Sequence, residues 1–165
     1  MASSQIVLGL TALCFCTWAV SLAGIASIQD KCEPSWGDWL VQFNGFSYNL
    51  PCSQLFRYYW FIVSLQFALI VGLGVAAAGG MYSKTRLSWL GLFSVVTLLY
   101  ISMSDTFLSV QYVSDDQGSI KNRVRTMIAG SIMTATVDCM LLFALGMTPE
   151  DAPAAAPAEG KANAV

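Results

Sequence analysis

Four long apolar runs, separated by shorter polar stretches, constrain what this chain can fold into. They cover residues 5–28, 57–80, 87–113 and 126–147. About 20 apolar residues in an α-helix cross the ~30 Å hydrocarbon core of a bilayer, because each residue adds ~1.5 Å. Only 11% of the residues are charged, against about 25% in a typical soluble domain. The sequence therefore predicts an all-α, four-helix transmembrane bundle that lies in a lipid bilayer.

The first apolar run could be either a secretory signal peptide or a membrane helix. Residues 1–5 carry no positive charge and the run is longer than the apolar part of a usual signal, which favours a retained helix. At the other end, residues 148–165 are rich in alanine and proline and have no apolar face to bury. We expect one transmembrane domain over residues 1–147 and a disordered tail over 148–165.

Two cysteines, Cys32 and Cys52, lie in the longest connection, between the first and second runs. On an oxidising side of the membrane they could close a disulfide loop, which is worth ~2–4 kcal/mol of stability. Two free thiols beside the membrane are the alternative. The connection is long and polar and contains turn signals such as Asn44-Gly45, so we predict the disulfide.

Four spans put both termini on one side of the membrane, but two signals disagree about which side. The positive-inside rule, taken as a count, places the termini outside, because Lys31, Arg57, Lys121, Arg123 and Arg125 lie opposite them and only Lys84, Arg86 and Lys161 lie on their side. The predicted disulfide places the termini in the cytosol, since its loop needs an oxidising compartment. We predict cytosolic termini, and charges at the mouth of the fourth helix at Lys121, Arg123 and Arg125.

The composition excludes or disfavours several classes of function. The formal net charge of −2 argues against a nucleic-acid partner, which needs a concentrated basic patch. The chain has no histidine, so imidazole ligands and histidine bases are excluded. Its five cysteines are too scattered for a zinc site, and there is no phosphate-binding loop. We predict a protein that is not an enzyme and uses no cofactor and no metal.

One acidic residue, Asp138, lies near the middle of the fourth run. An unpaired charge at that depth costs at least ~2.5–3.5 kcal/mol, so the side chain must face protein or water, or be protonated. Ser131 and Thr134 precede it at intervals of three and four residues and therefore share its helix face. The fourth helix is predicted to carry one polar stripe.

The third run carries a similar stripe, made of Ser102, Asp105 and Ser109. Asp105 is eight residues from Val113 (113 − 105), and Asp138 is twelve residues from the start of the fourth run at position 126 (138 − 126). In antiparallel helices the two carboxyls then differ in depth by ~6 Å. We expect them to share a polar patch, with Gln66 of the second run forming a hydrogen bond between helices.

Two interpretations of this polar interior stay open. In the first, it is a conduit or substrate site, which is the usual hypothesis for acids within the membrane. In the second, it is packing, in which protonated or hydrogen-bonded carboxyl groups hold two helices together. The candidate residues are the same in both cases: Gln66, Ser102, Asp105, Ser109, Ser131, Thr134 and Asp138.

Short motifs in the second and fourth runs resemble a known family. The fourth run contains Arg123-Val124-Arg125-Thr126, Thr134-Ala135-Thr136, Leu141-Leu142 and Gly146. The second contains Phe61-Ile62, Phe67-Ala68-Leu69 and Ala76-Ala77-Ala78-Gly79. These motifs are similar to those of the abscisic-acid-induced wheat plasma-membrane polypeptide family, whose members are small four-helix plant and algal proteins. The resemblance covers about the second half of the chain.

This resemblance implies a multi-pass protein of the plasma membrane that forms a homo-oligomer, a trimer. The green-algal branch of the family includes a low-CO2-inducible plasma-membrane protein of the carbon-concentrating mechanism. For this chain it implies a channel that takes up CO2 or another inorganic-carbon species. Land-plant relatives are linked instead to uptake of abscisic acid, so transport of a small organic acid is an alternative.

The scarcity of charge favours CO2 over bicarbonate as the permeant. CO2 is small, linear and uncharged, and needs only a narrow, mostly apolar path, whereas ionised carboxylates at Asp105 and Asp138 would repel an anion.

A tetraspan scaffold without transport is the competing class. Claudin-like scaffolds place two cysteines after a tryptophan-rich element, but here Trp36-Gly37-Asp38-Trp39 is followed only by Cys52, and Cys32 precedes it. The sequence therefore predicts passive passage of a small uncharged molecule.

Overall fold

Four long helices make up most of the protein. The computed structural model describes residues 2–32, 50–113 and 118–147. Helices long and apolar enough to span a membrane are α1 (Ala2–Gln29), α4 (Arg57–Ala78), α5 (Tyr82–Val113) and α6 (Gly118–Met147), and a short helix, α3 (Cys52–Leu55), precedes α4. The residues that the structure describes contain no strand. The predicted all-α, four-helix membrane fold is confirmed.

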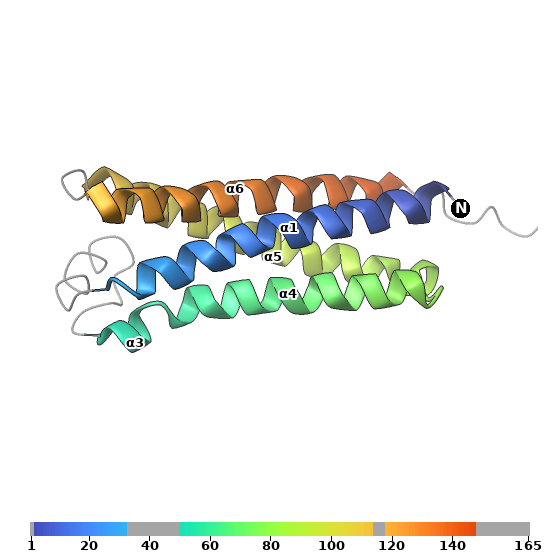
Figure 1. Cartoon of the computed structure of the whole chain (residues 1–165). Helices are drawn as coiled ribbons and strands as arrows, with labels where there is room; N and C mark the ends of the chain where they lie inside the picture. Colours follow the sequence, from blue (N-terminus) through green and yellow to red (C-terminus); the bar gives the residue numbers. More distant parts are fainter. Residues whose placement is uncertain (1, 33–49, 114–117, 148–165) are drawn as a thin grey trace, which may run out of the picture.

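The four helices form an antiparallel ring (Figure 1). Helix α1 packs against α6 and α4, and α5 packs against the same two helices from the other side. The start of α1 and the end of α6 lie at the same end of the bundle, and α3 lies at the opposite end (Figure 1). The Cys32–Cys52 disulfide joins the end of α1 to the start of α3, as predicted. The tail over residues 148–165, predicted to be disordered, is outside the described residues.

A tight turn makes α4 and α5 antiparallel neighbours. Helix α4 ends at Ala78 and is capped by Gly79, and the next residue, Gly80, adopts a φ of 69°. This left-handed conformation suits glycine, which lacks a Cβ atom. It allows the Met81 backbone N–H to donate to the Ala76 carbonyl oxygen, the bond that closes a Schellman cap.

Three helices begin earlier than the apolar runs that predicted them, and α1 does so by only three residues, at Ala2. Helix α5 starts at Tyr82 rather than position 87, and α6 starts at Gly118 rather than position 126. The polar residues in between are compatible with helix. An apolar run marks the part of a helix that crosses lipid, so it underestimates a helix that extends beyond the hydrocarbon region.

The outer face of the bundle is apolar. Leu87, Leu98 and Phe143 expose between 66% and 80% of their surface, and many other large apolar side chains are also exposed. In water such a surface would be a strong driving force for association. Lipid is the environment in which this face is stable.

Helices α1 and α6 approach each other more closely than side chains would allow. A Cβ atom on Gly130 would lie 2.6 Å from the Ser21 backbone nitrogen, and one on Gly24 would lie 2.7 Å from the Met127 Cα. Glycine at these two positions lets the two backbones touch. Close approach of this kind is a main source of helix association in lipid.

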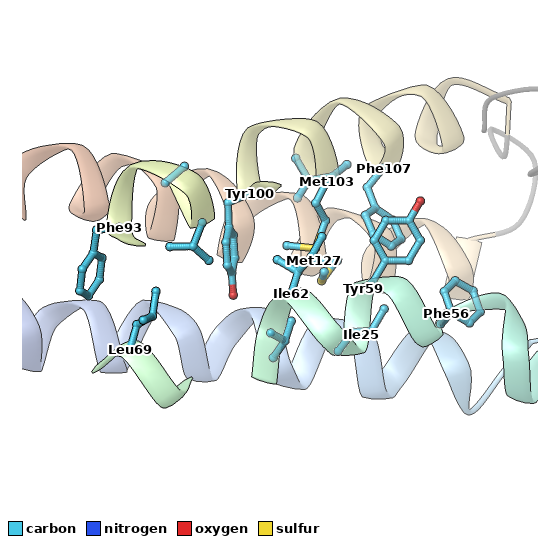
Figure 2. Packing of buried hydrophobic residues seen from close by; sticks show 14 of the residues in the cluster. Ile25, Phe56, Tyr59, Ile62, Leu69, Phe93, Tyr100, Met103, Phe107 and Met127 are labelled. Carbon is cyan, nitrogen blue, oxygen red and sulfur yellow. The ribbon is translucent and has the colours of Figure 1, made fainter. Parts of the chain in front are cut away.

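Layers of large apolar side chains fill the core along the bundle (Figure 2). Phe93 and Leu69 lie on one side of Tyr100, and Met103, Ile62 and Met127 lie on the other (Figure 2). The largest of these side chains are almost completely buried. Tyr100 is therefore a polar group between two apolar layers.

Candidate functional site: a polar layer at the centre of the bundle

Each long helix contributes one polar side chain to a layer in the middle of the bundle. They are Cys14 of α1, Gln66 of α4, Tyr100 of α5 and Asp138 of α6, and the relative exposure of all four is 0%. We call this set the polar layer. It includes side chains from helices that are diagonal in the ring, so it occupies the bundle axis.

Three hydrogen bonds connect α1, α4 and α6 within the polar layer. The Gln66 Nε2 donates to Asp138 Oδ1 over 2.8 Å and to Cys14 Sγ over 3.0 Å. The Cys14 thiol also donates to Asp138 Oδ1, over 3.1 Å. Both bonds to the carboxyl thus end on the same oxygen. Asp138 holds the side chains of two other helices through Oδ1 alone.

Tyr100 enters the polar layer from α5. The rings of Tyr59 and Phe107 are in contact, with centroids 5.1 Å apart. Gln66 lies seven residues after Tyr59, and Tyr100 lies seven residues before Phe107. Seven residues are about two helical turns, so in antiparallel helices Gln66 and Tyr100 face each other at the same depth. The Tyr100 hydroxyl points toward α1 (Figure 2), where it approaches the Ser21 hydroxyl as well as the carboxyl and thiol of the layer.

Three atoms of the polar layer have no hydrogen-bond partner. They are Asp138 Oδ2, Gln66 Oε1 and the Tyr100 hydroxyl, all fully buried. Leaving a buried polar group unpaired costs ~1–3 kcal/mol. No lysine or arginine of the described chain forms an ion pair with Asp138. The layer therefore combines an uncompensated carboxyl with unused hydrogen-bonding capacity.

Paired hydroxyl groups extend the polar region toward the end of the bundle that carries the disulfide. Ser21 and Thr134 share a hydrogen bond of 3.3 Å between α1 and α6. One turn further, Ser104 of α5 donates to Ser131 of α6 over 2.9 Å. All four hydroxyls also bond to carbonyls of their own helices, so none is left unpaired.

Apolar layers close the polar region at both ends. Toward the disulfide end lie Met103, Met127 and Phe107, each at most 1% exposed. Toward the other end lie Leu73, Phe93 and Leu141, each 0% exposed. An ion crossing the bundle along its axis would lose its hydration in these layers without polar groups to replace it.

Four of the predicted site residues lie on the buried faces, and three do not. Ser131, Thr134 and Asp138 share one buried face of α6, and Gln66 joins them across the bundle axis. Asp105 and Ser102 are exposed, and Ser109 is only partly buried. The structure does not bring Asp105 to Asp138.

The orientation of α5 explains why Asp105 points outward. Tyr100, Met103 and Phe107 form the inward stripe of this helix, at intervals of three and four residues. Asp105 is two positions from Met103, which is a rotation of ~200° around the helix. Large apolar side chains fill the core, so the polar stripe of α5 takes the opposite face. Asp105 lies six residues from the end of its candidate span at Gln111, close enough to the boundary to reach water.

The three predicted mouth charges have different environments. Arg123 donates to the Ser27 carbonyl oxygen over 2.6 Å and lies 3.7 Å from an Asp30 carboxylate oxygen. It therefore joins the start of α6 to the end of α1. Arg125 is exposed and Lys121 is partly buried.

Sequence reasoning missed two members of the polar layer, Cys14 and Tyr100. A cysteine in an apolar helix resembles a small hydrophobic residue. A tyrosine in mid-span, away from the interfacial belts where tyrosine is common, was the one available signal for Tyr100. The described residues hold no cluster of three or more metal-ligating side chains.

Comparisons of the chain with protein-family models, with curated proteins and with solved structures give no match.

Proposed function

We propose that this protein is a membrane channel for a small uncharged molecule, with CO2 as the preferred permeant. The observation that supports this proposal is the polar layer, which lies on the bundle axis, has unpaired atoms and is enclosed by apolar layers. A neutral molecule crosses apolar layers at little electrostatic cost. The polar layer offers this molecule a transient binding site within the bundle.

The same layers argue against an ion as the permeant. Bicarbonate carries a full charge, and a buried charge without a partner is costly. No cationic side chain of the described chain pairs with the polar layer, so nothing there would balance the charge of an anion. The same argument disfavours a small organic acid such as abscisic acid in its ionised form.

The finer parts of the proposal rest on the sequence resemblance described above. It supports a place in the plasma membrane, assembly as a homotrimer and uptake of inorganic carbon for a carbon-concentrating mechanism. We propose passive flow of CO2 down its gradient. No nucleotide-binding motif occurs in the sequence.

The test is a CO2 jump on liposomes that contain the purified protein, carbonic anhydrase and a pH-sensitive dye. We expect internal acidification to be faster than in protein-free vesicles, under conditions where diffusion through lipid is not limiting. Equal rates would refute the channel. Asp138→Asn changes the polar layer, and we expect it to alter the rate by at least about twofold, or ~0.4 kcal/mol in barrier. The matched control is Asp105→Asn, on an exposed face, with an unchanged rate.

A tetraspan scaffold without transport is the second candidate. It is favoured by the filled core and by the contact of the α1 and α6 backbones at Gly24 and Gly130. A scaffold would collect at cell contacts and would give no CO2 flux. In that case Asp138→Asn would change stability alone.

A further inference from the structure

We propose that the polar layer is a binding site for one small hydrogen-bonding molecule, which in the resting protein is water. We also propose that the Asp138 carboxyl is protonated when it binds this molecule. This site is independent of the proposed channel function. It follows from the hydrogen-bonding groups that the four helices bring together, whether or not CO2 crosses the protein.

Two of the unpaired atoms belong to side chains that are hydrogen-bonded to each other. Asp138 Oδ2 shares a carboxyl with Oδ1, and Gln66 Oε1 shares an amide with Nε2. Because Oδ1 and Nε2 are joined by a 2.8 Å hydrogen bond, the two unpaired oxygens flank this bond. Tyr100 faces Gln66 from α5, and its hydroxyl is also unpaired. Three helices thus bring unused polar atoms to the same level of the bundle.

The positions of the donors indicate where the proton of Asp138 lies. Cys14 and Gln66 both donate to Oδ1, so Oδ1 acts as an acceptor. No cation pairs with the carboxyl in the described chain, and an isolated buried carboxylate is far less stable than the neutral acid. The neutral acid therefore has its hydrogen on Oδ2, the oxygen that has no hydrogen-bond partner.

The groups that face Asp138 do not supply a compensating positive charge. Helix α1 presents the Cys14 thiol, α4 presents the uncharged Gln66 amide and α5 presents the Tyr100 phenol. Both titratable neighbours, the thiol and the phenol, are neutral or negative. Neither of them can balance the charge of an ionised carboxylate.

Counting donors and acceptors identifies the guest. The site offers two O–H donors, from Asp138 Oδ2 and Tyr100, and one acceptor, Gln66 Oε1. Water accepts two hydrogen bonds and donates one here, and three bonds are typical of buried water. Ammonia has a single lone pair, and CO2 has no hydrogen to donate. A monovalent cation would need an ionised carboxylate and would contact only lone pairs.

The first experiment measures the protonation of Asp138 by infrared spectroscopy of the full chain in lipid at neutral pH. We expect the C=O band of a protonated, buried carboxyl, a downward shift of this band in D2O, and its loss in Asp138→Asn. Asp105→Asn is the matched control and should keep the band. A spectrum without a protonated-acid band, or with a band that Asp138→Asn leaves unchanged, would overturn the assignment.

The second experiment locates the guest and does not depend on the folding of an Asp138 variant. A crystal structure at a resolution that orders water should show one density peak within hydrogen-bond distance of Asp138 Oδ2, Gln66 Oε1 and the Tyr100 hydroxyl. Tyr100→Phe removes one donor and nothing else, so we expect the peak to weaken or vanish. An empty layer in the wild-type protein, or a peak that appears only with added Na⁺, would refute the water site.

Discussion

Asp138 links three helices through a single oxygen atom. Its Oδ1 accepts hydrogen bonds from Gln66 of α4 and Cys14 of α1. Because two hydrogen bonds from two other helices end on this atom, the residue is important to stability whatever else it does. This contribution to stability depends on the acceptor oxygen and not on a charge. A variant that keeps the oxygen can therefore be compared with one that removes it.

We predict that Asp138→Leu lowers the free energy of unfolding by about 1–3 kcal/mol, because the buried Gln66 amide then loses the carboxyl oxygen to which it donates. Asp138→Asn keeps an acceptor oxygen and should cost less than about 1 kcal/mol. Unfolding by denaturant in mixed micelles measures both values, with Asp105→Leu on the exposed face as control. Equal stability of the Leu and Asn variants would mean that the hydrogen bonds contribute nothing.

At the residue scale the sequence predicted half of the candidate site. Asp138, Thr134 and Ser131 could be found because polar residues in an apolar run stand out and their spacing fixes a common face. The sequence does not show which face of a helix points to the core when all its faces are similarly apolar. For this reason Asp105 was predicted to lie in the interior although it is exposed. Packing of large side chains such as Phe107 decides this, and packing depends on the other helices.

At the scale of elements, α1 and α6 are in contact backbone to backbone. Gly24 and Gly130 each face the backbone of the other helix, at positions where a Cβ atom has no space. This contact holds Ser21 beside Thr134 and Cys14 beside Asp138. The polar layer therefore depends on glycines that are not part of it.

We predict that Gly130→Ala destabilises the protein by about 1–3 kcal/mol, because its Cβ would lie 2.6 Å from the Ser21 nitrogen and would push the helices apart. The matched control is Gly74→Ala in α4, where the added Cβ meets nothing within 4 Å. There alanine favours the helix by up to ~1 kcal/mol. Thermal unfolding in detergent compares the two; a Gly130→Ala protein as stable as Gly74→Ala would contradict the close approach.

The number and order of the helices could be predicted from the sequence, but their neighbours could not. Length and apolar composition determine a span, which is why four runs gave four membrane helices. The ring order, with α1 between α4 and α6, depends on which surfaces fit. Its main determinants, Gly24 and Gly130, are single glycines on helices far apart in sequence, and no local pattern marks them as partners.

For the whole molecule, the Cys32–Cys52 disulfide and the distribution of cations give opposite orientations. The disulfide lies at the end of the bundle opposite the start of α1 and the end of α6 (Figure 1). Arg123, one of the cations at that end, is engaged with Ser27 and Asp30, so part of its charge is locally balanced. We give more weight to the covalent bond, which needs an oxidising compartment.

We predict that the disulfide end faces outward and the termini face the cytosol. Intact cells treated with a membrane-impermeant reductant and then an impermeant maleimide should be labelled at Cys32 and Cys52, and a Cys32→Ser/Cys52→Ser variant should not. The other cysteines, Cys14, Cys16 and Cys139, lie within spans and serve as an internal background. Labelling only after permeabilisation would reverse the topology.

The disulfide should also stabilise the protein, because it closes a separation of 20 residues. We predict that reduction lowers the free energy of unfolding by ~3 kcal/mol. Denaturation curves recorded with and without a reductant measure this difference.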